Sequence, residues 1–258
     1  MEVVNNQTLG LALLLPLLAG MATAFGSLLG IFIQKPNARF MAITLGFSAG
    51  VMIYVSFVEL LQEGINAVGF IPANLVFFGG LLLMMGVDAI MPHQYLAEHH
   101  KIGQRPRNGE LLRAGVFCAI GIAIHNFPEG MATFAGTLQD PALGIAIATA
   151  IAIHNIPEGL AISVPVYAAT GSRKKAFWWS VFSGLAEPLG ALIAAVILRP
   201  YLNATVLGYV LAAVAGIMVF ISMDELLPIA KSYDSEHDAI LGVIVGMAVM
   251  ALSLWLLG

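Results

Sequence analysis

The sequence predicts an all-α integral membrane protein that forms a single transmembrane domain over residues 1–258. Hydrophobic residues make up 59% of the chain and charged residues only 10%. A soluble globular domain, by contrast, is about 25% charged. The single cysteine, Cys118, excludes an internal disulfide and a cysteine-based zinc site. The formal net charge of −4 gives no sign of nucleic-acid binding.

Eight stretches have the length of a transmembrane helix, which needs about 20 mostly apolar residues. The first has no basic residue before it and is too long for the core of a signal peptide, so we expect it to be retained. The connections are short except for one loop at about 92–111. We predict spans at about 9–32, 39–61, 71–91, 112–138, 142–169, 175–198, 204–229 and 239–257.

The basic residues of the loops predict the orientation in the membrane. An even number of spans puts both termini on the same side. With the termini outside, ten basic residues fall in or beside inner loops and one, Arg199, in an outer loop. The inner ten are Lys35, Arg39, Lys101, Arg105, Arg107, Arg113, Arg173, Lys174, Lys175 and Lys231. Because basic residues concentrate on the cytoplasmic side, both termini are expected to be extracytoplasmic and the 92–111 loop cytoplasmic.

One motif occurs twice, on the fourth and fifth predicted spans. Residues 122–132 read IAIHNFPEGMA and residues 151–161 read IAIHNIPEGLA, with nine of eleven positions identical. In each copy a His and a Glu stand four apart, on one face of a helix: His125 with Glu129, and His154 with Glu158. The proline before each Glu removes a helical hydrogen bond, so a local kink with a free carbonyl oxygen is expected. Imidazole, amide and carboxylate groups are ligands for a borderline divalent metal.

A second repeat relates the second span to the seventh. Residues 50–61 read GVMIYVSFVELL and residues 216–227 read GIMVFISMDELL, with Glu59 matched to Glu225. The predicted topology runs these two spans in opposite directions. Inverted repeats are typical of transporters that open to the two sides in turn. We therefore predict a 3+2+3 arrangement, in which spans one to three are mirrored by spans six to eight.

Three acidic residues, Glu129, Glu158 and Glu187, fall near the middle of their spans. An acidic residue at the centre of a membrane helix costs about 2.5 to 3.5 kcal/mol. A lone glutamate could be protonated or hydrogen-bonded to a neighbouring helix, but three of them, two with a His and an Asn beside them, favour a metal site. Every Lys and Arg lies in a loop or at the end of a span, so a divalent cation is the neutralising group that remains.

Other polar residues lie nearer the ends of spans, where two readings stay open. Glu59, near the outer end of the second span, could contact metal or water. A further group of residues lies near the inner ends of spans, where it could form an exit site for metal or could simply belong to solvated helix ends. This group consists of Asp88, His93, Asp224 and Glu225. His99 and His100 are better read as part of a solvated loop than as metal-capturing residues.

The sequence resembles the ZIP family of divalent-metal transporters. The resemblance rests on HNFPEG and HNIPEG on consecutive spans, and on GLAEPLG around Glu187, GVDAIMPH and MDELLP. It implies eight helices with extracytoplasmic termini and a central two-metal site. One metal would be held by His125, Glu129, His154 and Glu158, with Glu59 as a contributor from the second span. The other would be held by Asn126, Asn155 and Glu187, with Glu129 and Glu158 bridging both.

The function that the resemblance implies is uptake of divalent cations into the cytoplasm, with zinc, ferrous iron, manganese, cobalt and cadmium as substrates. These metals would be transported substrates and not cofactors. We expect no enzymatic activity, a location in the cytoplasmic (inner) membrane, and metal ions and the lipid bilayer as partners; assembly as a homodimer stays open. The alternative is an intramembrane metal-dependent hydrolase, which favours an HExxH helix that this sequence lacks.

The topology can be tested by thiol labelling in a background that carries Cys118→Ser. We expect Asn5→Cys to react with a membrane-impermeant reagent in intact cells, and Gly103→Cys to react only after the cells are opened. Labelling of Gly103→Cys from outside intact cells would reverse the topology and the direction of transport.

Overall fold

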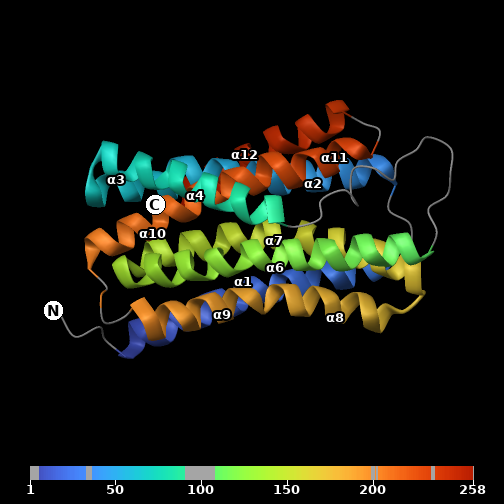
Figure 1. Cartoon of the computed structure of the whole chain (residues 1–258), viewed down its shortest axis with the longest axis horizontal. Coiled ribbons are helices and arrows are strands. Elements are labelled where there is room, and N and C mark those ends of the chain that lie inside the picture. The colour runs from blue at the N-terminus through green and yellow to red at the C-terminus, as the bar shows by residue number, and fades with distance from the viewer. Residues whose placement is uncertain are drawn as a thin grey trace.

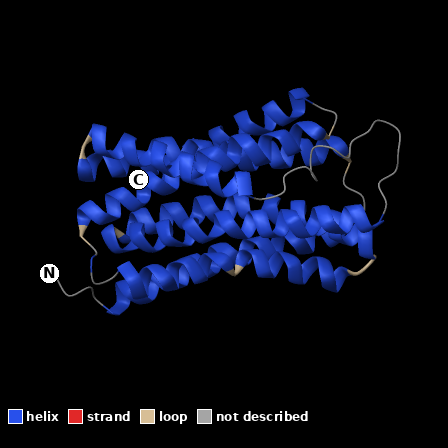
Figure 2. Cartoon of the chain, viewed as in Figure 1, coloured by secondary structure: helices blue, strands red, loops and turns tan. Residues whose placement is uncertain are grey.

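The computed structural model describes residues 6–32, 37–90, 108–198, 201, 203–233 and 236–257. All regular secondary structure in these ranges is helical (Figure 2). The α-helices are α1 (Asn6–Phe32), α2 (Ala38–Val55), α3 (Leu61–Val68), α4 (Phe70–Ile90), α6 (Asn108–Gln139), α7 (Pro141–Thr170), α8 (Arg173–Gly184), α9 (Ala186–Ile193), α10 (Ala204–Ile221), α11 (Leu227–Ser232) and α12 (Glu236–Leu257). Three π-helical segments continue them: η1 (Ser56–Leu60), η2 (Ala194–Leu198) and η4 (Ser222–Leu226).

The helices coincide with the predicted spans, with one clear difference in length. The second span continues as α2, η1 and α3 to Val68, beyond the predicted end at residue 61. Within the described part of the chain, seven helical stretches are long and apolar enough to cross a membrane. The fourth predicted span corresponds to α6, which is not among these seven. Helices α6 and α7 run without interruption through Pro128 and Pro157.

The helices form two bundles (Figure 1). In the first bundle, α1 packs along α7, α6 packs against α7 and α9, and α8 lies on α1. In the second bundle, α2 packs along α12, and α10 packs against α3 and α4. The bundles meet where α2 contacts α7 and α10 contacts α6.

The contacts between helices can be compared with the predicted repeat. If spans one to three are exchanged with spans six to eight, and span four with span five, the α2–α12 pair corresponds to the α10–α4 pair and the α1–α7 pair to the α9–α6 pair. All four pairs are in contact. The repeated sequence therefore has a counterpart in the packing of the helices.

A π-helical segment interrupts each copy of the second repeat at the same position. Ser56 opens η1 and Ser222 opens η4. The Ser56 hydroxyl donates a hydrogen bond to the carbonyl of Met52 at 2.6 Å, and the Ser222 hydroxyl donates to that of Met218 at 2.7 Å. Single-turn π segments inside helices are frequent at functional sites. The two copies thus share local backbone structure as well as sequence.

Glycines allow the backbones of paired helices to approach closely. A Cβ atom added to Gly50 would overlap the carbonyl of Val243 on α12, and one added to Gly216 would overlap the carbonyl of Phe77 on α4. Membrane helices gain little from hydrophobic association with one another, so close packing across small residues supplies much of their affinity.

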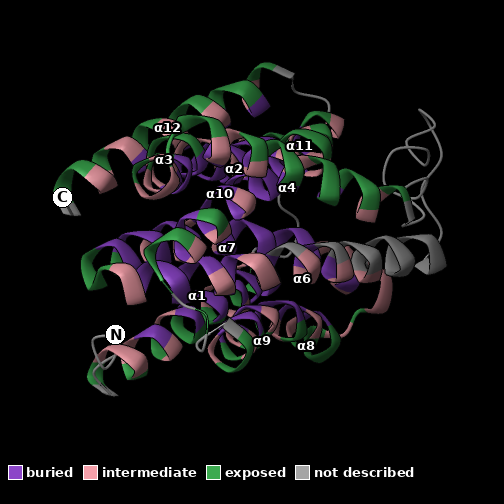
Figure 3. Cartoon of the chain, turned by 60° about the vertical axis from the view of Figure 1, so that its left-hand side comes forward, coloured by how far each residue is buried: buried purple, intermediate pink, exposed green. Residues whose placement is uncertain are grey.

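Burial is uneven among the helices (Figure 3). In the most apolar stretch of each helix, 72% of the residues of α7 are buried but only 22% of those of α12. Helix α4 is as exposed as α12. The exposed apolar side chains of α4 and α12 suit contact with lipid, whereas α7 lies at the centre, where polar groups are shielded.

We expect Gly216→Ala to destabilise the second bundle by about 1 to 3 kcal/mol, because the added methyl group overlaps backbone atoms that cannot move independently. Gly79→Ala is the matched control, since a Cβ there meets nothing within 4 Å. Thermal unfolding of the purified variants in detergent would show a lowered midpoint for Gly216→Ala alone. Equal midpoints would contradict the close helix packing.

Candidate functional site

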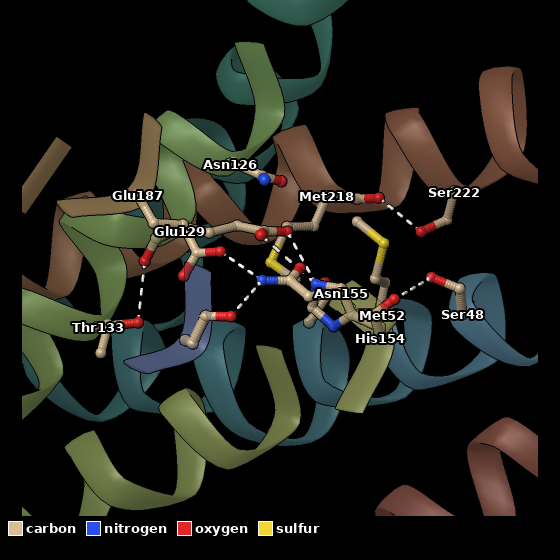
Figure 4. Close-up of polar contacts among 12 residues, drawn as sticks. Ser48, Met52, Asn126, Glu129, Thr133, His154, Asn155, Glu187, Met218 and Ser222 are labelled. Carbon is tan, nitrogen blue, oxygen red and sulfur yellow. Dashed lines mark hydrogen bonds and ion pairs between the residues drawn. The ribbon is translucent and has the colours of Figure 1, made fainter. Parts of the chain in front are cut away.

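Six polar side chains from the first bundle are fully buried at its centre. They come from three helices: α6, α7 and α9. Each has 0% of its surface exposed. Figure 4 shows five of them by label, with the Glu129, His154, Asn155 and Glu187 side chains converging. The six are Asn126, Glu129, His154, Asn155, Glu158 and Glu187.

The first contact in this cluster joins the two copies of the motif. Nε2 of His154 lies 3.3 Å from Oε1 of Glu129 and 3.4 Å from Oε2. A histidine from one copy therefore faces a glutamate from the other. The Ser48 hydroxyl of α2 donates a hydrogen bond to the His154 carbonyl at 3.3 Å, so the second bundle borders the cluster here.

The second contact joins the motif on α7 to Glu187. The Asn155 amide donates a hydrogen bond to Oε1 of Glu187 and another to the carbonyl of Ala19 at 2.9 Å. The Asn126 amide donates in a similar way to the carbonyl of Ser183 at 3.3 Å. Both amides thus use their N–H groups on neighbouring helices, and this orients their carbonyl oxygens.

Several buried oxygen atoms of this cluster have no hydrogen-bond donor among the residues that the structure describes. They are Oδ1 of Asn126, Oδ1 of Asn155 and Oε2 of Glu187. Buried polar atoms normally have partners, because an unpaired buried acceptor costs free energy. The buried polar residues of the described chain include no Lys or Arg. Together these oxygens and the His154 imidazole suit a divalent cation.

The glycine of each motif brings a neighbouring helix against the cluster. A Cβ atom on Gly130 would overlap the carbonyl of Glu187, and one on Gly159 would overlap the carbonyl of Thr23 on α1. The glycine that follows each Pro-Glu pair therefore allows a backbone to approach beside the glutamate. At Gly130, the backbone of Glu187 therefore lies directly against α6.

Part of the predicted site lies outside the described residues. The backbone of His125 lies in α6, but its side chain is not among those described. His93, His99 and His100 lie outside the described ranges. In the described part, no group of three or more His, Cys, Asp or Glu side chains is arranged to hold a metal ion. The metal ligands therefore remain predictions.

The residues predicted at the span ends lie apart from this cluster. Glu59 lines a cavity of about 320 Å³, together with Glu63, Gln139 and Asp140. In this cavity the Gln139 amide donates a hydrogen bond to Glu63 at 2.7 Å.

The predicted exit site is only partly described. Asp224 and Glu225 lie in η4, the first exposed and the second half-buried. Asp88 is half-buried near the end of α4. Since His93 lies outside the described residues, the exit site stays a prediction.

Two methionines, which hydropathy alone does not distinguish from lipid-facing residues, are fully buried. Met52 is 0% exposed and Met218 is 1% exposed, and both appear in the close-up of the site (Figure 4). Met52 stands four residues after Ser48, so it shares the face of α2 that meets α7 beside His154. The signal that could have identified them was their matched position in the second repeat.

Comparisons with known proteins bear on the whole chain. The sequence profile of the family described as ZIP Zinc transporter matches residues 91–254. A protein of Oceanobacillus iheyensis named zinc transporter ZupT is 51% identical over 263 residues, which cover 96% of this chain and 98% of that protein. The ZupT of Chlorobium phaeovibrioides is 54% identical over 260 residues, and these cover 95% of this chain and 97% of that protein.

A third relative extends the match to a more distant bacterium. The ZupT of Campylobacter jejuni is 47% identical over 281 residues, with 96% of this chain and 97% of that protein covered. The matches run through both HNxPEG motifs and the helices that surround them. The predicted resemblance is confirmed, and the chain belongs to the ZIP zinc transporter family.

Proposed function

We propose that this multi-pass membrane protein carries zinc ions across the cytoplasmic membrane into the cytoplasm. The observation that carries the proposal is the buried cluster on α6, α7 and α9, where three carboxylates meet an imidazole and two amides without a buried Lys or Arg among the described residues. The zinc transporters named above support zinc as the substrate. Membership of a transporter family confirms the prediction that the chain is not an enzyme and weighs against the hydrolase alternative.

The cluster is proposed to hold two metal ions. One would be bound by His125, Glu129, His154 and Glu158, and the contact between His154 and Glu129 supports this grouping. The other would be bound by Asn126, Asn155 and Glu187, with Glu129 and Glu158 bridging. The hydrogen bond between Asn155 and Glu187 supports this second grouping. A cation at that position would be coordinated by the oxygen atoms that lack hydrogen-bond donors.

Ferrous iron, manganese and cobalt are proposed as further substrates. The ligand set combines imidazole nitrogen with carboxylate and amide oxygen, and such mixed sets bind several first-row divalent metals. The order of preference among these metals depends on how strongly the imidazole nitrogens contribute to metal binding.

We further propose that α6 is an eighth span in a 3+2+3 arrangement with both termini extracytoplasmic. The pairing of α2 with α12 and of α10 with α4 supports the inverted repeat. The ten-to-one distribution of basic residues supports the orientation. Inverted repeats around a buried ion site fit a carrier that opens to the two sides in turn.

The proposal is tested by zinc flux into proteoliposomes that contain the purified protein alone. We expect Glu129→Gln and Glu158→Gln each to reduce zinc flux at least a hundredfold, because the loss of a shared carboxylate weakens the binding of both metal ions at once. Thr137→Ala is the matched control, since Thr137 is buried on α6 two turns after Glu129 and its hydroxyl donates to the Thr133 carbonyl. Wild-type flux in either glutamine variant, at equal amounts of inserted protein, would refute the shared site.

For His125→Ala, we expect altered selectivity and lower zinc affinity with transport retained, because the carboxylates still bind cations after one terminal ligand is lost. Imidazole favours zinc and ferrous iron, whereas sites with only oxygen ligands favour manganese. The measurement is competition of radioactive zinc uptake by ferrous iron, manganese and cobalt, in wild type and variant. Unchanged zinc affinity and rank order would mean that His125 is a packed core residue.

A further inference from the structure

A groove of about 600 Å³ runs along the outer face of α8, away from the metal cluster. The opposite face of this helix is buried, since Ala176 packs with Ile31 of α1 and Val166 of α7. The groove therefore faces outward from the first bundle. Its lining residues are Ser172, Lys174, Lys175, Trp178, Trp179 and Phe182.

The lining residues change in polarity along the helix axis. Lys174, Trp178 and Phe182 follow one another at intervals of four residues, so they lie on one face. At 1.5 Å per residue, Lys174 and Phe182 are separated by roughly 12 Å along the axis. The groove thus begins with ammonium groups, continues with indole rings and ends with an apolar ring. This order matches the phosphate, glycerol and acyl-chain regions of a phospholipid.

The charged side chains that line the groove are two lysines. Lys174 and Lys175 are exposed, and among the described residues neither has an acidic partner. Among the residues that the structure describes, the groove lining includes no Asp or Glu. Both lysines stand in the first turn of α8, where the helix dipole disfavours cations, so the helix itself gains nothing from them. The complementary ligand is an anion.

The aromatic side chains lie where the span enters the membrane. The membrane-spanning stretch that includes α8 begins at Arg173, so the groove occupies its first three turns. Trp178 and Phe182 are each 57% exposed, and such apolar exposure fits contact with lipid. Tryptophan is enriched at the level of the lipid headgroups, because its ring is apolar and its N–H can hydrogen-bond.

We propose that this groove binds one anionic phospholipid, with the phosphate between Lys174 and Lys175, the glycerol region beside Trp178 and Trp179, and an acyl chain along Phe182. The site is separate from the proposed metal site and does not depend on zinc transport. With the predicted topology, the lipid belongs to the cytoplasmic leaflet.

The test uses tryptophan fluorescence in vesicles of fixed surface charge. A Trp255→Phe background leaves only Trp178 and Trp179 as fluorophores. Two vesicle preparations contain phosphatidylglycerol and phosphatidylcholine in the same ratio. In the first preparation only the phosphatidylglycerol is brominated, and in the second only the phosphatidylcholine. Each lysine near an anionic lipid contributes a factor of about five, so we expect the site to prefer phosphatidylglycerol roughly twenty-fold.

The variants Lys174→Gln and Lys175→Gln should together bring this preference close to one. Lys231→Gln removes one positive charge at an exposed position of α11 and should leave the preference unchanged. Equal quenching by the two brominated lipids in the wild type would mean that Trp178 and Trp179 are ordinary interfacial residues without a specific lipid site, and it would overturn the proposal. So would an unchanged preference in the double variant. Loss of the preference on adding millimolar inorganic phosphate to both sides would mean a site for free phosphate instead.

Discussion

The carboxylates of Glu129, Glu158 and Glu187 are fully buried in a bundle whose described core contains no lysine or arginine. Burying an ionised carboxylate without a partner is among the most costly arrangements in a protein, and in a membrane water cannot relieve it. Hydrogen bonds alone do not resolve this here, since Oε2 of Glu187 has no donor among the described residues. Under the proposed function, a bound cation would neutralise these glutamates, so stability and metal binding would depend on the same residues.

Hydrogen bonds to neighbouring helices fix the two asparagine amides of the cluster. Each asparagine of the two motifs donates to a backbone carbonyl of a neighbouring helix, Asn126 to Ser183 and Asn155 to Ala19. An amide fixed through its nitrogen presents its oxygen in a defined direction, so less reorganisation is needed when a cation binds. Gly130 has a related effect, because the absence of a side chain lets the backbone of Glu187 approach α6.

The sequence was sufficient for the parts of the structure that depend on hydropathy and repetition. The positions of the spans follow from apolar length, and the burial of Glu129 and Glu158 follows from their depth in duplicated spans. The π-helical segments could not be predicted, because SFVEL and SMDEL differ in no local way from α-helical sequences. Their effect is large, since a π turn holds about one residue more than an α turn and rotates the residues that follow. Glu59 lies within η1, so the direction of its side chain does not follow from α-helical spacing.

The burial of Met52 and Met218 could not be predicted for a different reason. Apolar residues on membrane helices are common, and hydropathy does not distinguish a residue that faces lipid from one that faces a buried site. Only the match between the two repeats marked these methionines, and it became informative once α2 was seen against α7. The side chain of His125 shows the opposite case, in which the sequence motif is strong and the structure does not describe the group.

The seam between the two bundles borders both the buried cluster and the acidic cavity. Ser48 of the second bundle touches the backbone of His154 in the first, so the cluster lies beside this seam. The cavity with Glu59 and Glu63 on one side and Gln139 and Asp140 on the other lies along the same seam, and the bond from Gln139 to Glu63 crosses it. Walls of low dielectric constant strengthen the field of carboxylates between them. Acidic groups at these two places therefore favour cations over anions beside the seam. Under the proposed function, selection for positive charge would begin at the cavity, and discrimination among metals would fall to the nitrogen and oxygen atoms of the buried cluster.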